Sequence, residues 1–126
     1  MDKRIRQAQL EALGIFSSKS QTFALAGGTA LELYYLHHRF SWDLDFFSPK
    51  YSMDEVRELV SHFKAAGYKM KLESQFVAGG KAQVCFYTAK ISGTKRPLKI
   101  DFVEDVIFKK PAIQRFAGVP VYGIDN

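Results

Sequence analysis

The chain has 126 residues, of which 47% are hydrophobic and 25% are charged, and its formal net charge is +5. These values exclude disordered and fibrous chains, and the length suits one folded domain rather than two. No apolar stretch reaches the roughly 18 residues of a membrane span, and the N-terminus lacks the apolar centre of a signal peptide. The positive surplus favours anionic partners such as nucleic acid or nucleotides, although a merely soluble basic surface explains it equally well.

The only cysteine, Cys85, lies in the apolar run VCFY. A single cysteine cannot form an intrachain disulfide, which agrees with a reducing compartment, so we predict a cytoplasmic protein. Burial in the core is the expected place of this thiol, in preference to a catalytic role.

The first third of the chain alternates helical and extended patterns. Apolar residues at helical spacing predict a helix over residues 3–19, with Gly14 as a candidate end or bend. Residues 22–26 form a short apolar run that predicts a strand ending at a glycine pair, and residues 29–38 then predict a helix. Residues 42–47 are rich in β-formers and stop before a Ser-Pro pair, which predicts a second strand.

The sequence SMDE over residues 52–55 matches a capping box and predicts the start of a third helix. In this motif Ser52 accepts from a backbone N–H, and Glu55 reaches back to the backbone N–H of Ser52. Apolar residues at helical spacing follow, and Gly67 is a natural residue to end the helix.

The second half of the chain changes to short β-rich runs. Residues 68–77, 82–91 and 98–103 are separated by good turn sequences, which predicts a meander of antiparallel strands. The tail supplies one more candidate strand at residues 119–122. The predicted fold class is therefore α+β, a mixed sheet covered by helices in one domain.

Two aspartates, Asp43 and Asp45, lie one residue apart in the predicted strand 42–47. Because successive side chains of a strand point to opposite faces, the two carboxylates project together while Leu44 faces the core. Asp101 in the run LKIDFV repeats this pattern, so three carboxylates converge if the two strands are neighbours. Such a cluster repels itself unless a divalent cation binds, and oxygen ligands suit Mg²⁺ or Mn²⁺. The chemistry indicated is phosphoryl or nucleotidyl transfer, with solvent-exposed positions on a one-sided sheet as the alternative.

The glycine pair, Gly27 and Gly28, stands between a predicted strand and a predicted helix. Glycines let a backbone approach a phosphate closely, and the N-terminus of the helix offers free N–H groups and the positive end of its dipole. A tight strand-to-helix turn explains the pair by itself. Together with the aspartates, however, the glycines predict a phosphate cradle beside a metal-binding carboxylate pair.

The segment GGTALELYYLHHRFSWDLDFF closely resembles the core motif of the nucleotidyltransferase superfamily, and specifically of the AbiEii/AbiGii toxin family. The family pattern is GGTAL, a helix, and then R-x-S-x-D-x-D-F. The residues that match it are Gly27, Gly28, Thr29, Ala30, Leu31, Arg39, Ser41, Asp43, Asp45 and Phe46, with Asp101 of KIDF as the third acid. The resemblance covers roughly residues 20–105 and implies a minimal polymerase-β-like nucleotidyltransferase fold.

The resemblance also implies ligands and roles. A nucleoside triphosphate would bind with Mg²⁺ or Mn²⁺; Asp43 and Asp45 would hold the nucleotide-bound metal, and Asp101 would help to activate the acceptor hydroxyl. The implied nucleotide-binding residues are Gly27, Gly28, Thr29, Arg39 and Ser41, and the implied catalytic and metal-binding residues are Asp43, Asp45 and Asp101. The expected context is a toxin–antitoxin or phage-defence system, with RNA or tRNA as acceptor, a cognate antitoxin protein as partner, and no membrane.

Family members continue into a helical region that this chain, which ends at Asn126, is expected to lack, so residues 1–126 are predicted to form a single nucleotidyltransferase-like domain. Two alternatives stay open: a non-catalytic nucleotide- or RNA-binding module, and nucleotidyl transfer to a small molecule. Lys95, Arg96 and Lys99 flank the strand of Asp101 and are candidates for contacts with a nucleic-acid backbone, although a solvated hairpin tip explains the first two as well.

Overall fold

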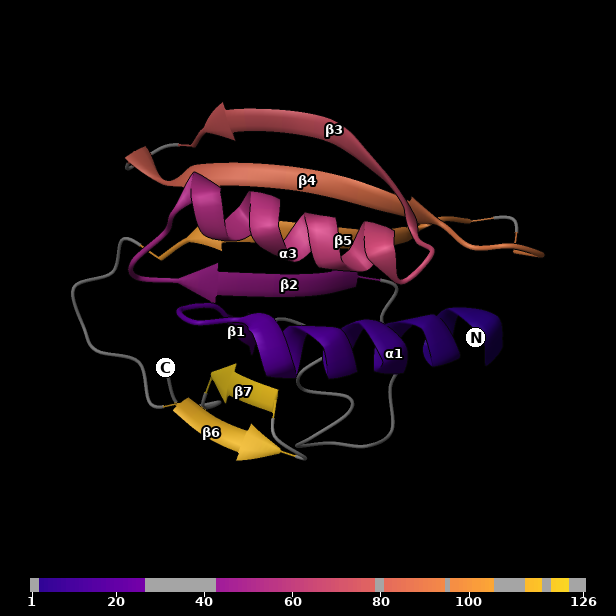
Figure 1. Cartoon of the computed structure of the whole chain (residues 1–126). Helices are drawn as coiled ribbons and strands as arrows, with labels where there is room; N and C mark the ends of the chain where they lie inside the picture. The colour runs from indigo at the N-terminus through magenta and orange to yellow at the C-terminus, as the bar shows by residue number, and fades with distance from the viewer. Residues whose placement is uncertain are drawn as a thin grey trace.

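The computed structural model describes residues 3–26, 43–78, 81–94, 96–105, 113–116 and 119–122. Within these residues the chain forms a seven-stranded sheet and two helices (Figure 1). The elements are α1 (Lys3–Lys19), β1 (Ala24–Ala26), β2 (Asp43–Ser48), α3 (Met53–Ala65), β3 (Lys69–Val77), β4 (Gln83–Lys90), β5 (Leu98–Glu104), β6 (Ile113–Phe116) and β7 (Val119–Tyr122). The predicted α+β class is confirmed.

The sheet is mixed, with the strand order β3-β4-β5-β2-β1-β7-β6. The predicted meander is confirmed, because β4 pairs antiparallel with both β3 and β5. Strand β2 joins the meander by pairing in parallel with β5, and on its other side it pairs antiparallel with β1. This topology makes neighbours of the two strands that carry the predicted site aspartates, although they lie far apart in the sequence.

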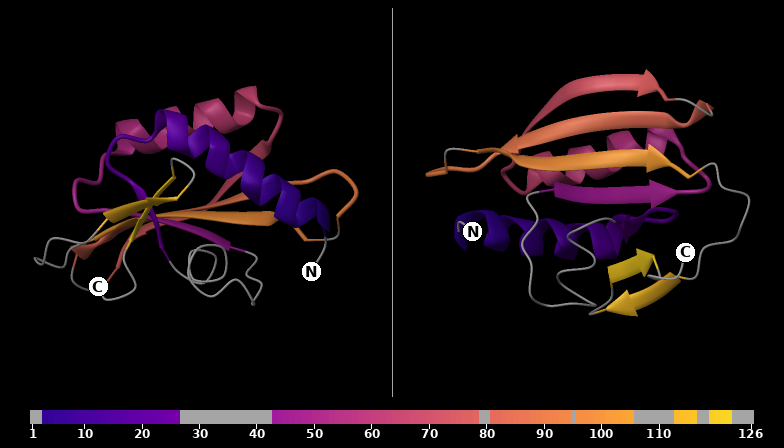
Figure 2. Two further views of the ribbon diagram at one scale, coloured as in Figure 1. Left: turned by 90° about the horizontal axis from the view of Figure 1, so that it is seen from below. Right: turned by 180° about the vertical axis from the view of Figure 1, so that it is seen from behind.

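Both described helices lie on one face of the sheet (Figure 2). Their apolar stripes pack onto the strands and form the core, with Phe16 of α1 stacked on Phe46 of β2 at a ring-centroid distance of 3.9 Å. Phe46 in turn lies 5.7 Å from the Phe102 ring of β5. The buried residues of the helices are Ile5, Ala8, Gln9, Ala12, Leu13 and Phe16 in α1, and Val56, Leu59, Val60 and Phe63 in α3.

Helix α1 has the predicted bounds, but Gly14 does not end it. The helix continues to Lys19, and the hydroxyl of Ser17 donates a hydrogen bond to the Gly14 carbonyl at 2.9 Å. A Cβ atom at Gly14 would meet no other atom within 4 Å. The glycine is therefore required neither by a turn nor by close packing.

The start of α3 follows only half of the predicted capping box. The hydroxyl of Ser52 accepts from the Glu55 backbone N–H at 3.4 Å, as predicted. The Glu55 carboxylate does not reach back to Ser52; it accepts from the backbone N–H groups of Gln21 and Thr22 at 2.6 and 3.0 Å. Glu55 thus ties the helix to the segment before β1. At the other end, Gly67 adopts φ +101° directly after the cap residue, which confirms it as the terminating glycine.

The tail contains two strands where one was predicted. Strand β7 has the predicted bounds, whereas β6 was not predicted. Strand β6 has the sequence IQRF and lies at one edge of the sheet, where it pairs only with β7. Natural edge strands are short and often carry charged residues, so a four-residue run that contains Arg115 gives little sequence signal.

Other predictions are settled by the same residues. Cys85 is fully buried, as predicted, and its sulfur lies 3.2 Å from the hydroxyl of Tyr51. The helix predicted over residues 29–38 lies outside the described residues. Neither described helix is long and apolar enough to cross a membrane.

Candidate functional site

The predicted site aspartates lie on the face of the sheet opposite the two helices. Along β2, exposed and buried residues alternate: Leu44 and Phe46 are fully buried, while Asp43 and Asp45 are half-buried on the other face. Strand β5 pairs with β2 in parallel, and the register sets Asp45 opposite Asp101. The prediction that the three acids share one face on neighbouring strands is therefore confirmed as geometry.

Asp45 and Asp101 form a hydrogen-bonded pair of carboxyl groups. Asp101 is only 7% exposed, and this burial, together with the charge of Asp45, raises the pKa of Asp101 to about 7. Burial also raises the pKa of Asp45, and the charge of Asp43 adds to that rise. Burial and mutual repulsion therefore oppose ionisation of both carboxyl groups, so the pair is costly to ionise without a cation.

Among the described residues, Lys99 is a positive charge that lies beside these acids. It lies two residues before Asp101 on β5, directly opposite Asp43, and its Nζ atom is 3.8 Å from the Asp43 carboxylate. Its charge lowers the pKa of both Asp45 and Asp101, against the effect of burial. The same Nζ lies 5.9 Å from the centre of the Phe86 ring.

The position of Lys99 was missed as part of the site. The sequence had suggested only that this lysine contacts a nucleic-acid backbone. Its spacing of two residues from Asp101 was the available signal, because residues two apart in a strand share a face. The sequence did not show that this strand pairs with β2, which is what places Lys99 opposite Asp43.

A divalent cation fits this group by chemistry. The ligands on offer are hard carboxylate oxygens, and among the described residues the buried Oδ1 atom of Asp101 has no hydrogen-bond partner. In the described part of the chain no group of three acidic, histidine or cysteine side chains is arranged to hold a metal ion by itself. Mg²⁺ commonly binds through one or two carboxylates plus substrate phosphates and water, so an open arrangement of this kind is what it uses.

The residues predicted to bind the triphosphate, Gly27, Gly28, Thr29, Arg39 and Ser41, lie outside the described residues. The described chain nevertheless fixes where this segment begins. Strand β1 ends at Ala26, and the register of β1 with β2 sets Ala26 opposite Asp45. The chain thus enters the predicted glycine turn from a residue that is paired with the acid cluster.

A model of the family described as "Nucleotidyl transferase AbiEii toxin, Type IV TA system" matches residues 10–122. No curated protein matches the chain. Among solved structures, the chain is similar to the JHP933 protein from Helicobacter pylori, with a TM-score of 0.63 and 20% identity over 99% of the chain and 54% of that structure. A further H. pylori protein has a TM-score of 0.63 and 18% identity over 99% of the chain and 56% of its own.

A third similar structure is MenT4, a nucleotidyltransferase toxin from Mycobacterium tuberculosis, with a TM-score of 0.52 and 21% identity over 78% of the chain and 36% of that structure. At these identities the likeness establishes the fold. The chain spans about half the length of the two H. pylori structures.

Proposed function

The chain belongs to the AbiEii nucleotidyltransferase toxin family, and from this premise we propose that it transfers a nucleotidyl group from a nucleoside triphosphate to a hydroxyl acceptor, with RNA or tRNA as the acceptor. The observation that carries the proposal is the parallel register of β2 and β5, which joins Asp45 and Asp101 on one sheet face with Asp43 beside them. Carboxylates in this arrangement suit phosphate chemistry that depends on a divalent cation.

Asp43, Asp45 and Asp101 are the residues that would hold Mg²⁺ or Mn²⁺. When bound, the cation would supply positive charge to the phosphate oxygens and offset the repulsion between the acids. The high pKa of Asp101 and its unsatisfied Oδ1 support this assignment, because both mark a site built for a positive partner.

Within this site the acids and the glycine segment have separate roles. The backbone of Gly27, Gly28 and Thr29 would bind the triphosphate, with Arg39 and Ser41 at the mouth of the site. The acceptor oxygen forms a bond to the α-phosphorus, the bond from that phosphorus to the β-phosphate oxygen breaks, and pyrophosphate leaves. In this reaction Asp101 in its ionised form accepts the proton of the acceptor hydroxyl.

The first test is calorimetric titration of the four ribonucleoside triphosphates with Mg²⁺ into the chain. Asp45→Asn keeps the shape of the side chain and removes its charge, so we expect it to lose Mg²⁺-dependent nucleotide binding. Asp54→Asn is the matched control, because Asp54 is 95% exposed on α3, away from the acids. Binding that Asp45→Asn retains in full would refute the assignment of the metal site.

A second test identifies the reaction and its acceptor. Incubation with a triphosphate labelled in its α-phosphate should transfer the label to RNA, and the product should require Asp101. A label found on a small hydroxyl compound instead would favour the alternative acceptor class.

A non-catalytic binding module is the second candidate, and one observation favours it: in the described part of the chain no group of three acidic, histidine or cysteine side chains is arranged to hold a metal ion. It predicts nucleotide or RNA binding with no labelled product.

A cognate antitoxin is a further proposed partner, since the family model describes a toxin–antitoxin system. Co-expression that relieves growth inhibition would identify it.

A further inference from the structure

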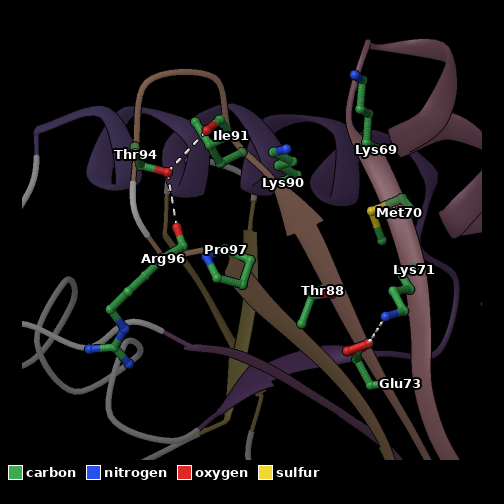
Figure 3. A pocket seen from close by; sticks show the side chains of 10 residues that line it. All are labelled: Lys69, Met70, Lys71, Glu73, Thr88, Lys90, Ile91, Thr94, Arg96 and Pro97. Carbon is green, nitrogen blue, oxygen red and sulfur yellow. Dashed lines mark hydrogen bonds and ion pairs between the residues drawn. The ribbon is translucent and has the colours of Figure 1, made fainter.

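A basic pocket of about 510 Å³ lies over β3, β4 and the hairpin between β4 and β5 (Figure 3). Lys69, Lys71, Lys90 and Arg96 line it, with Glu73 as the one acidic residue among the lining side chains. Glu73 pairs with Lys71 at 3.2 Å. The pocket therefore carries a surplus of positive charge, which suits an anionic ligand.

Two of these lysines face each other in a way that is unfavourable without such a ligand. Lys69 and Lys90 are direct partners in the antiparallel register of β3 and β4. Like charges directly opposite in a sheet destabilise it, and in the described part of the chain neither lysine forms an ion pair that would offset this repulsion. A bound phosphate between them would reverse the sign of the interaction.

The pocket is connected with the acid cluster by the register of the sheet. Lys71 is opposite Thr88, Thr88 is opposite Lys99, and Lys99 is opposite Asp43. Residues paired in this way share one face, so the row runs across the side of the sheet that carries the acids. With about 4.8 Å between neighbouring strands, Lys71 lies roughly 14 Å from Asp43 along the row.

The wall of the pocket is fixed before any ligand binds. The hydroxyl of Thr94 lies 3.0 Å from the Ile91 carbonyl and 2.9 Å from the Arg96 carbonyl (Figure 3). Arg4 of α1 donates a hydrogen bond to the Gly93 carbonyl at 2.9 Å. Gly93 has φ +83°, a backbone conformation that L side chains rarely adopt, so this position of the hairpin favours glycine. A preorganised wall lowers the cost of ordering on binding.

Farther along β3 and β4, the same face of the sheet carries the aromatic residues Phe76 and Phe86. Phe86 is opposite Asp101 in the register, and the ring of Phe76 packs edge-on against it at 5.4 Å. Phe76 remains 42% exposed. Basic grooves with adjacent exposed aromatic rings bind single-stranded nucleic acid, since phosphates meet the cations and bases stack on the rings. An acidic protein segment would use the lysines but would have no use for the rings.

We propose that the open face of β3, β4 and β5 is the docking surface for a single nucleic-acid strand, whose phosphates contact Lys69, Lys71 and Lys90 and whose bases stack on Phe76, with the strand passing beside Asp101. This inference rests on the proposed function, because it supplies the site that holds the acceptor. It assigns the acceptor to a polymer rather than to a small hydroxyl compound.

The test measures binding of a fluorescently labelled single-stranded RNA by anisotropy at several salt concentrations. The double variant Lys69→Ala, Lys90→Ala should bind on the order of tenfold more weakly at about 50 mM salt, and its slope of log affinity against log salt should fall by about 1.4, the value for two lost phosphate contacts on a single strand. Lys19→Ala, Lys64→Ala is the matched control, because it removes the same charge from exposed ends of α1 and α3.

A single change at Phe76 separates a nucleic acid from other polyanions. Phe76→Ala should weaken RNA binding about fivefold or more and leave binding of inorganic polyphosphate unchanged. Equal competition by polyglutamate and by RNA, with no effect of Phe76→Ala, would instead assign the surface to an acidic protein and overturn the proposal.

Titration of Mg²⁺ and nucleoside triphosphate into the lysine variants distinguishes this inference from the proposed function. Retained nucleotide binding with weakened RNA binding supports the docking surface. Unchanged RNA binding in the Lys69→Ala, Lys90→Ala variant, or an equal loss in the control variant, overturns the docking surface whether or not nucleotides bind. Absence of nucleotide binding by the wild-type chain, with RNA binding still weakened in the lysine variant, would count against the proposed function alone.

Discussion

Residues that alternate along β2 and β5 have opposite energetic roles on the two faces of the sheet. On the face covered by helices, Leu44, Phe46, Ile100 and Phe102 are all fully buried in one apolar core. On the open face, the intervening positions bring Asp43, Asp45 and Asp101 together, against their mutual repulsion. The strands are thus held by one face, and the stability gained there allows an unfavourable charge cluster on the other.

The carboxylates of Glu55 and Asp101 show the same difference between the two faces of the sheet. Glu55, in the first turn of α3, has its oxygens occupied by the N–H groups of Gln21 and Thr22 and by the Thr22 hydroxyl. Asp101 is more deeply buried, yet its Oδ1 has no hydrogen-bond partner among the described residues. A satisfied carboxylate stabilises the native state, whereas an unsatisfied one is retained at a cost. This difference separates a structural acid from a candidate site acid.

The largest expected effect comes from breaking the covered face. Phe46→Ala should lower the free energy of unfolding by about 3–5 kcal/mol, because it removes a fully buried ring that stacks on Phe16 and leaves a cavity. Urea denaturation followed by circular dichroism measures the change. Phe47→Ala is the neighbouring control on the open face, where the ring is only half-buried, and it should cost clearly less. Equal losses in the two variants would contradict the contrast.

The next effect tests the satisfied carboxylate. Glu55→Ala should cost about 2 kcal/mol, since it leaves the N–H groups of Gln21 and Thr22 without their acceptor. Glu55→Gln keeps one carbonyl oxygen and should lose less. Thermal unfolding of both variants checks this order. Identical melting temperatures for Glu55→Ala and the wild type would show that these contacts contribute nothing.

Glu55 also marks how far local sequence rules reach. The capping box correctly located the start of α3, because Ser52 acts on a backbone group three residues away. It failed for Glu55, whose partners lie more than 30 residues earlier in the chain and are brought close only by the tertiary fold. Helix bounds and the meander follow from local periodicity and turns, whereas the edge strand β6, with only one paired neighbour, leaves almost no pattern.

The acid cluster was predictable for a different reason. Strand alternation predicts which face Asp43, Asp45 and Asp101 occupy, and the resemblance to the AbiEii family, now supported by the family match, named Asp101 as the third acid. That β2 and β5 are neighbours was only a condition of the prediction, and the structure meets it. The role of Lys99 could not be obtained in this way, because its position beside Asp43 depends on the register between two strands distant in sequence. The assignment of these residues to catalysis stays a prediction.

Asp101→Asn should stabilise the protein while abolishing nucleotidyl transfer. Because burial and the charge of Asp45 raise the pKa of Asp101 to about 7, the native state holds a proton that the unfolded state releases near pH 4. Stability of the wild type therefore falls as pH rises from about 4 to about 7, and the full penalty is present above that range. The asparagine removes this penalty, so we expect a gain of about 1–2 kcal/mol at about pH 8 and little gain at about pH 5.

Denaturation at both pH values measures this difference. Asp54→Asn is the control, since Asp54 is exposed and its replacement should have the same small effect at both pH values. A destabilised Asp101→Asn protein at about pH 8 would mean that Asp101 is a structural acid like Glu55. Added Mg²⁺ should raise the melting temperature of the wild type more than that of the variant, because only the wild type retains the full ligand set.

The smallest effect concerns Lys99, and it tests whether this lysine offsets the repulsion between the acids on the open face. The Lys99–Asp43 pair is half-exposed and 3.8 Å long, so Lys99→Met should cost less than about 1 kcal/mol. Lys99 lowers the pKa of Asp45 and Asp101, so its removal should raise the pKa of both aspartates further. The decline of stability with rising pH should then continue to a higher pH. The variant should accordingly lose more stability at about pH 8 than at about pH 5, where Asp101 is protonated in either protein.

Melting temperatures across this range check the result, with Lys64→Met on α3 as the control that should show no such pH dependence. A loss that is the same at both pH values would show that Lys99 contributes only packing over Phe86, and that the acids are balanced by something other than this lysine.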